Sequence, residues 1–184
     1  MHEQAHFAVI SGGMITGPRI GPIGEVAGYI QQAYKDVEQA TGVKFGEKFL
    51  TETLAQGTAI FTSIPPAIAL SVFKTHLPEQ AVAFAGTLQK AIYYDGLQPL
   101  NLAGYAPYAA AYGVDGDQFV AAMSDPAFAQ AAKKEFAYTA GVGVNGFPTV
   151  LVQNAQRSYV VARGYLPYPT LYERVQQALT LLAE

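Results

Sequence analysis

Helical spacing fills the middle of this chain, and strand patterns occur only near its two ends. Between residues 25 and 123, apolar side chains recur at intervals of three and four residues, which is the period of an amphipathic helix. The first helix is expected over 25–40, with Val26, Ile30 and Val37 on its apolar face. Hardly any strand signal interrupts this segment, so the fold must accommodate a long, mainly helical stretch.

Helix starts and stops are marked by residues with a defined effect on the first and last turns. Ser63-Ile64-Pro65-Pro66 places proline in a first turn, where its missing N–H costs nothing, and Asp125-Pro126 adds an N-cap to such a proline. Gly42 is expected just beyond the first helix. Val82 and Leu88 are predicted to face inward. The remaining helices are expected over 47–55, 65–75, 77–95, 100–112, 117–123 and 126–140, with a last one from Pro169.

Three short segments have the composition of strands. His6–Ile10 is an apolar run that ends at Ser11-Gly12-Gly13, and we interpret it as a buried strand. Thr149–Val152 and Tyr159–Ala162 flank a turn at Asn154–Gln156 and predict a β-hairpin. An order of strand, helices, hairpin and helix predicts an α/β sandwich with helices on a small mixed sheet.

Composition and charge limit the kinds of partner. With 51% hydrophobic and 14% charged residues, the 184-residue chain can bury a core. Its net charge is −3 and no basic face is visible, so nucleic acid is not an expected partner. No apolar stretch reaches the roughly 18 residues of a membrane span, and the N-terminal residues lack the pattern of a signal peptide. A cytoplasmic location is therefore expected.

The sequence contains no cysteine, so these residues supply no thiolate, disulfide or cysteine-ligated metal. His2 and His6 are four residues apart but have no third ligand nearby in the sequence, and we predict neither a metal site nor a cofactor. A group of tyrosines at helical spacing is predicted to cover the core with its hydroxyls outward, although a groove for apolar peptides is the alternative. These are Tyr93, Tyr94, Tyr105, Tyr108 and Tyr112.

A resemblance to a known family adds to this pattern. Gly143–Val152, which includes Gly146-Phe147-Pro148-Thr149, resembles the cis-proline segment of the thioredoxin superfamily. The helical stretch resembles the insertion of DsbA-like proteins. The chain is most similar to the cytoplasmic FrnE-like branch of that family, protein-disulfide isomerases, and the match covers essentially all of it. The resemblance implies a thioredoxin-like core over 1–24 and 124–184, and a helical insertion domain over 25–123.

One departure from the family concerns the redox centre. Family members begin with a strand and carry Cys-x-x-Cys at the start of the first long helix, where the helix N-terminus lowers the thiol pKa. Here His6–Ile10 resembles the family's second strand, and Met1–Gln4 resembles the end of the first helix. The first strand, most of the first helix and the redox motif are therefore not expected in this sequence.

A missing first strand would leave a sheet edge open beside the hairpin, and an open edge invites pairing with another chain. Three outcomes stay open: the protein starts upstream of Met1, the two flanking strands pair directly, or a homodimer forms through the edges.

The resemblance also implies a function and a site. It implies that the Phe147–Pro148 bond is cis and that the Phe147 backbone pairs with an extended peptide or a glutathione-like thiol, by strand addition. The expected function is that of a DsbA-family thiol-disulfide oxidoreductase or protein-disulfide isomerase without its cysteines, inactive in dithiol chemistry and with no catalytic residue. Gly146, Phe147, Pro148 and Thr149 are expected to bind substrate, and Gly12, Gly13, Met14, Ser63 and Pro65 are expected to flank the site.

Two other functions remain open at this point. One is a glutathione-dependent isomerase or transferase of the kappa-class or hydroxychromene-carboxylate isomerase type. The other is a non-catalytic module that binds peptides. Whether the chain is an enzyme, and which substrate it takes, is not decided by the sequence.

Overall fold

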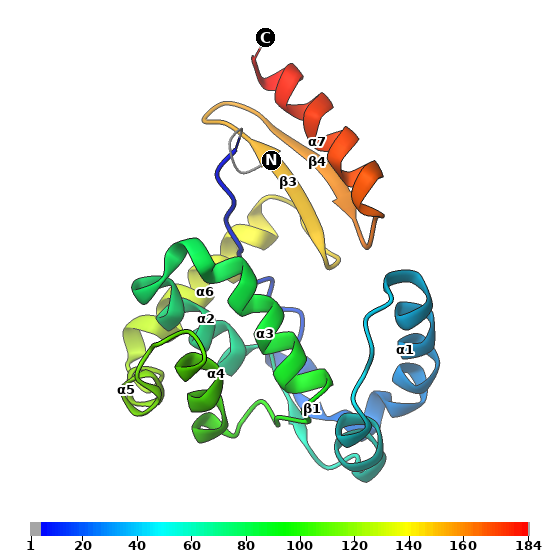
Figure 1. Cartoon of the computed structure of the whole chain (residues 1–184), viewed down its shortest axis with the longest axis vertical. Helices are drawn as coiled ribbons and strands as arrows, with labels where there is room; N and C mark the ends of the chain where they lie inside the picture. Colours follow the sequence, from blue (N-terminus) through cyan, green and yellow to red (C-terminus); the bar gives the residue numbers. More distant parts are fainter. Residues whose placement is uncertain (1–4, 184) are drawn as a thin grey trace.

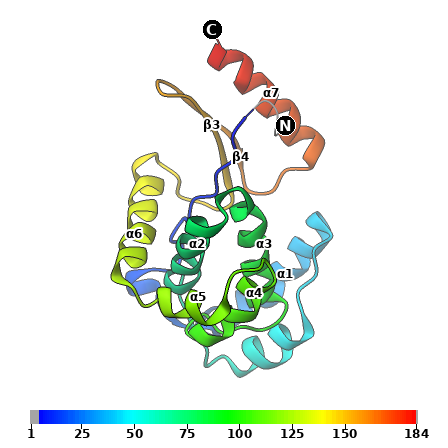
Figure 2. The same ribbon diagram turned by 60° about the vertical axis from the view of Figure 1, so that its left-hand side comes forward.

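The computed structural model describes residues 5–183 and shows a helical body with a β-hairpin and the last helix at one end (Figure 1). The same separation is visible in the turned view of Figure 2. The expectations for Met1–Gln4, including His2, lie outside the described residues.

The regular elements follow the predicted order. The helices are α1 (Ala27–Thr41), α2 (Ile64–His76), α3 (Ala81–Tyr93), α4 (Ala106–Ala110), α5 (Gly116–Ala122), α6 (Pro126–Gly141) and α7 (Tyr168–Ala183). Short 3₁₀ turns occur at Gly17–Arg19, Ile23–Val26, Pro78–Gln80 and Leu102–Tyr105, and a π-helical stretch covers Phe49–Leu54. The strands are β1 (Gly21–Pro22), β2 (Ile60–Phe61), β3 (Thr149–Gln153) and β4 (Ser158–Arg163).

The predicted helix boundaries have the expected local chemistry. The first turn of α2 contains proline, and Asp125 caps α6 by accepting a 2.8 Å hydrogen bond from the N–H of Ala127. Gly42 ends α1 in a left-handed conformation with φ of 75°, and its N–H donates to the carbonyl of Glu38 at 2.8 Å. These three predictions are confirmed.

The expected strand at 6–10 is wrong. This segment joins neither of the two-stranded sheets, which are β1–β2 and β3–β4. Phe7 and Ile10 are 37% and 43% exposed, so the segment is not buried either. The next residue, Ser11, is held by side chains of α6 rather than by a neighbouring strand. An apolar run becomes a strand only where a partner backbone lies alongside.

One further element is not predicted by the sequence. β1 and β2 form a two-residue antiparallel ladder in which Gly21 pairs with Phe61, and a strand of two residues is too short to show a period in the sequence.

At 100–112, Pro107 predicts either a kinked helix or a break between two shorter helices. The structure has the break: a 3₁₀ turn is followed by α4, and Pro107 lies in the first turn of α4.

The largest core cluster lies among α2, α3, α4 and α5. The rings of Phe73 and Phe84 stack with centroids 3.9 Å apart, and Tyr112 packs edge-on against both. Phe119 of α5 adds a further edge contact to Phe84. This aromatic group is the centre of the helical body.

Two predicted helix faces are only partly covered. On α3, the predicted burial is confirmed for Leu88 and wrong for Val82, which is 52% exposed because the helix meets the Phe73 side of α2 through Phe84 and Leu88. On α1, no side chain is fully buried, and Val37 is 43% exposed; Val26, directly before this helix, is 51% exposed. Sequence period identifies a helix more reliably than it identifies the side that meets its neighbour.

The hairpin has its own small core. Val161 of β4 packs against Val175 and Ala178 of α7, which covers one face of the two strands. The ladder is interrupted between Val150 and Leu151, so that Leu151 lies opposite Val160 and one residue of β4 bulges. None of the helices formed by residues 5–183 combines the length and apolar character needed to cross a bilayer.

Truncation of Phe84 tests the aromatic centre of the core. Phe84→Ala removes a fully buried ring that touches three others and should lower the free energy of unfolding by about 3–5 kcal/mol. Val82→Ala, on the exposed side of the same helix, should change it by no more than about 0.5 kcal/mol. Urea unfolding of both variants measures the difference, and equal losses would contradict the packing described.

Candidate functional site

The segment expected to bind substrate forms the entry into β3. The Phe147–Pro148 peptide bond is cis, as the resemblance implied. The carbonyl of Pro148 accepts a 2.7 Å hydrogen bond from the N–H of Gly164, and the hydroxyl of Thr149 donates to the carbonyl of Gly146 at 2.7 Å. The first bond ties the segment to the residue that follows β4, and the second closes a turn within the segment. The Phe147 side chain remains 40% exposed.

Gly12 lies directly against the ring of Phe147. A Cβ atom on residue 12 would come within 2.0 Å of ring atom Cε1, so no larger side chain fits while the ring keeps its position. The adjacent Gly13 has a φ of +68°, and a Cβ atom there would meet Phe136 of α6 at 2.7 Å. The two glycines therefore allow the backbone to pass between two aromatic rings.

Two residues after Gly13, the chain is attached to the start of α2 through Ile15. The N–H of Ile15 donates to Ser63 Oγ at 2.9 Å, and the N–H of Ser63 donates to the carbonyl of Ile15 at 2.8 Å. Met14, between the two attachments, is 49% exposed. Pro65 is buried in the first turn of α2, so its side chain belongs to the interior rather than to a contact surface.

The structure thus brings together Phe147, Gly12 and Gly13, and it connects Ser63 to this group through Ile15. It also adds residues of α6 that the sequence did not indicate. Glu135 pairs with Lys74 of α2 through Oε1 and accepts the Ser11 N–H through Oε2 at 2.7 Å. One acidic residue on an amphipathic helix gives no signal of such a role, because its partners lie 61 and 124 positions away.

All members of the predicted tyrosine group except Tyr94, which is 46% exposed, pack in or against the core, but their hydroxyls do not all point outward. Tyr105 is fully buried and its hydroxyl donates to the carbonyl of Pro99 at 3.0 Å; burial raises the pKa of this phenol. The Tyr108 hydroxyl donates to Asp95 Oδ2 at 3.0 Å, and burial together with this carboxylate raises the pKa of Tyr108 to about 12. Both phenols are therefore protonated donors near neutral pH.

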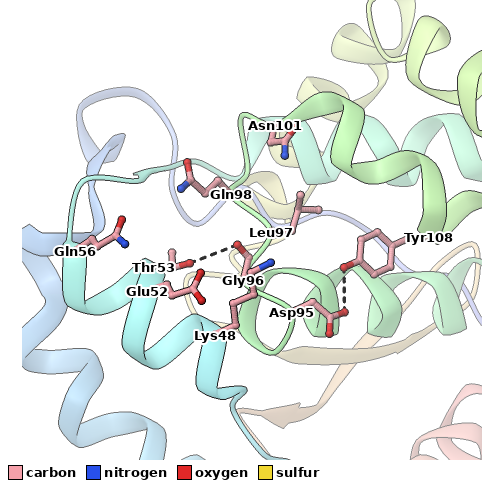
Figure 3. Close-up of a pocket in the computed structure, with 10 residues that line it drawn as sticks. All are labelled: Lys48, Glu52, Thr53, Gln56, Asp95, Gly96, Leu97, Gln98, Asn101 and Tyr108. Atoms are coloured by element: carbon pink, nitrogen blue, oxygen red, sulfur yellow. Dashed lines mark hydrogen bonds between the residues drawn. The ribbon is translucent and has the colours of Figure 1, made fainter.

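A polar hollow lies elsewhere on the helical body (Figure 3). It has a volume of about 510 Å³ and lies between the helical turn of Lys48 and Glu52 and the loop that carries Asp95. None of the residues expected from the sequence to bind substrate or flank the site lines it. Among residues 5–183, no group of three or more histidine, aspartate or glutamate side chains is placed to hold a metal ion.

Three solved structures resemble this chain. A protein from Nitrosomonas europaea, provisionally described as a protein disulfide isomerase, superposes with a TM-score of 0.76 at 21% identity, covering 85% of this chain and 75% of its own. The cytosolic disulfide reductase DsbM from Pseudomonas aeruginosa gives 0.69 at 23% identity, and its structure with GSH gives 0.66 at 24%. Each DsbM match covers 94% of this chain and 80% of that chain.

No protein-family model and no curated protein sequence matches the chain. The structural likeness shows the fold: it is the DsbA-like thioredoxin fold with a large helical insertion. Of the thioredoxin-like sheet, the described residues include the β3–β4 hairpin and no redox motif, because the sequence has no cysteine.

Gly12→Ala tests the contact between the glycine and the Phe147 ring. The added methyl group should displace the ring and lower the free energy of unfolding by about 1–3 kcal/mol. Gly146→Ala, where no atom lies within 4 Å of the new Cβ, should cost no more than about 0.5 kcal/mol. In a Phe147→Ala background, Gly12→Ala should become nearly neutral. A double-mutant cycle without coupling would show that the two residues do not meet.

Proposed function

We propose that this chain forms the substrate-docking part of a DsbA-type disulfide-exchange protein and binds an extended peptide along Gly146–Thr149. The observation that carries the proposal is the exposed Phe147–Pro148 segment at the entry into β3, a strand that pairs only with β4 among residues 5–183. The named activities of the structural neighbours, disulfide isomerase and disulfide reductase, support the reaction class. A cytoplasmic location is part of the proposal and is supported by the cytosolic DsbM.

The hydrogen-bonding pattern of the hairpin indicates how a peptide would bind. The backbone groups of successive residues in an antiparallel strand point alternately towards the partner strand and away from it. The carbonyl of Pro148 and the N–H of Asn154 both bond on the β4 side of the hairpin. The backbone groups of Leu151 therefore point away from β4, towards the outer edge. Among residues 5–183, β3 pairs only with β4. The strand carries no charged residue that would repel a partner. An extended peptide that continues from Phe147 along this edge would add a strand to the sheet.

The chemical contribution of these residues is limited to holding the substrate. In disulfide exchange, a thiolate attacks one sulfur of a disulfide and forms a mixed disulfide. The chain has no cysteine, so the attacking thiolate must come from outside these 184 residues. Docking would contribute by holding the peptide backbone in a fixed orientation for that attack.

A glutathione-like thiol is the second candidate ligand. It is favoured by the DsbM structure determined with GSH, because glutathione is itself a short peptide that could use the same backbone groups. The corresponding function is a glutathione-dependent isomerase or transferase. A second copy of the chain is the alternative occupant of the β3 edge and would produce a dimer in sedimentation.

Phe147→Ala tests peptide docking directly. Fluorescence anisotropy with labelled, carboxymethylated insulin B chain should show saturable binding to the wild type, and the substitution should weaken it about tenfold, because an exposed aromatic anchor is lost. Tyr29→Ala, on an exposed position of α1, is the matched control and should leave the affinity unchanged. Displacement of the peptide by reduced glutathione would favour the second candidate. Equal affinities of wild type and Phe147→Ala would contradict docking at this segment.

Insulin reduction tests the absence of dithiol chemistry. These 184 residues should give no turnover above the rate with dithiothreitol alone, because they contain no thiol. A complete relative with Cys-x-x-Cys serves as the positive control. Measurable turnover would refute the assignment of docking without chemistry. A non-catalytic module would bind peptide and stay inactive even when a segment with Cys-x-x-Cys precedes Met1.

A further inference from the structure

The carboxylate of Glu135 connects three parts of the chain that are distant in sequence. It lies on α6 with 23% of its side chain exposed, and Lys74 of α2 is exposed to the same extent. One carboxylate oxygen pairs with the Lys74 ammonium, and the other accepts the backbone N–H of Ser11 at 2.7 Å. A half-buried, charge-assisted bond to a backbone N–H is stronger than a neutral one. Glu135 therefore fixes the position of Ser11 relative to both helices.

Thr139, one turn later on α6, holds the other side of the same residue. It is buried, and its hydroxyl is 3.3 Å from the carbonyl oxygen of Ser11 and 2.8 Å from that of Glu135. Both backbone groups of Ser11 are thus bound by side chains of α6, in place of a neighbouring strand. The Ser11 hydroxyl itself is buried and makes no hydrogen bond to the described residues, so the helix holds the backbone and not the side chain.

The position of Ser11 determines the position of Phe147. Gly12 follows Ser11 directly and lies against the Phe147 ring, while Gly13 lies against Phe136, which is next to Glu135 on α6. The attachment of Ile15 to Ser63 fixes the far end of the segment. A shift of the backbone at Ser11 would therefore change the surface on which the Phe147 ring rests.

We infer that Glu135 is a positioning residue for the docking segment, assisted by Lys74 and Thr139. The inference rests on the proposed docking function and deepens it. Glu135 acts through Ser11 and Gly12 on the Phe147 ring and has no contact with the ligand. Its carboxylate fixes the docking segment before the peptide arrives, so less ordering is required on binding.

Three variants test this positioning role. Glu135→Ala removes the contacts with Lys74 and with the Ser11 N–H. Glu135→Gln keeps an oxygen that can accept the Ser11 N–H but loses the charge. Glu173→Gln, on the exposed side of α7, removes the same charge elsewhere and is the control. In Glu135→Ala, hydrogen exchange of the Ser11 amide should accelerate about tenfold and the affinity for the labelled insulin B chain should fall about tenfold, because a bond to a charged acceptor is lost. Glu135→Gln should show smaller changes in both, and the control should show none.

Two further measurements separate positioning from general stability. Urea unfolding gives the loss of stability of each variant, and the ring resonances of Phe147 should shift in Glu135→Ala while those of Phe84 do not. Unaltered Ser11 exchange, or unaltered peptide affinity despite faster exchange, would overturn the positioning role alone. A wild-type chain that binds no peptide would overturn the docking function, and the positioning role with it.

Discussion

The close contact between the Gly12 backbone and the Phe147 ring joins the two halves of this molecule. The hairpin and α7 form one packed unit, and the helices between Ala27 and Gly141 form the body. The segment after Ser11 passes between rings that belong to each of them, Phe136 from the body and Phe147 from the hairpin. Only glycine permits that approach, so the position of the candidate site depends on two residues without side chains.

In the proposed function, substrate docking is separate from reaction chemistry. The exposed segment before β3 offers backbone groups and an aromatic ring, which are the means by which extended peptides are bound in a sequence-tolerant way. Nothing in the composition supplies a sulfur nucleophile. The polar hollow beside Asp95 shares no lining residue with the candidate site. The hydrogen bond from the Tyr108 hydroxyl to Asp95 stabilises the loop that carries Asp95.

Sequence patterns predicted the elements whose signals are local. Proline in the first turn of α2, Asp125 before α6 and Gly42 after α1 act within one turn of the chain, so they were readable in isolation. The failures depend on partners: the run at 6–10 lacked a neighbouring strand, and Val82 faces solvent because α2 lies on the other side of α3. The docking segment came from family resemblance, whereas Glu135 became visible only when Lys74 and Ser11 were placed around it.

The small core under the hairpin determines how this end of the molecule is attached. Val161, Val175 and Ala178 pack with one another and with other apolar residues of the hairpin and α7, so this core forms its own cluster, separate from that of the helical body. The orientation of the hairpin on the body is therefore set by individual contacts. These include the contact of Gly12 with the Phe147 ring and the 2.9 Å hydrogen bond from the Tyr138 hydroxyl of α6 to Gln153 Oε1 of β3. Loss of either contact would alter that orientation while leaving both cores packed.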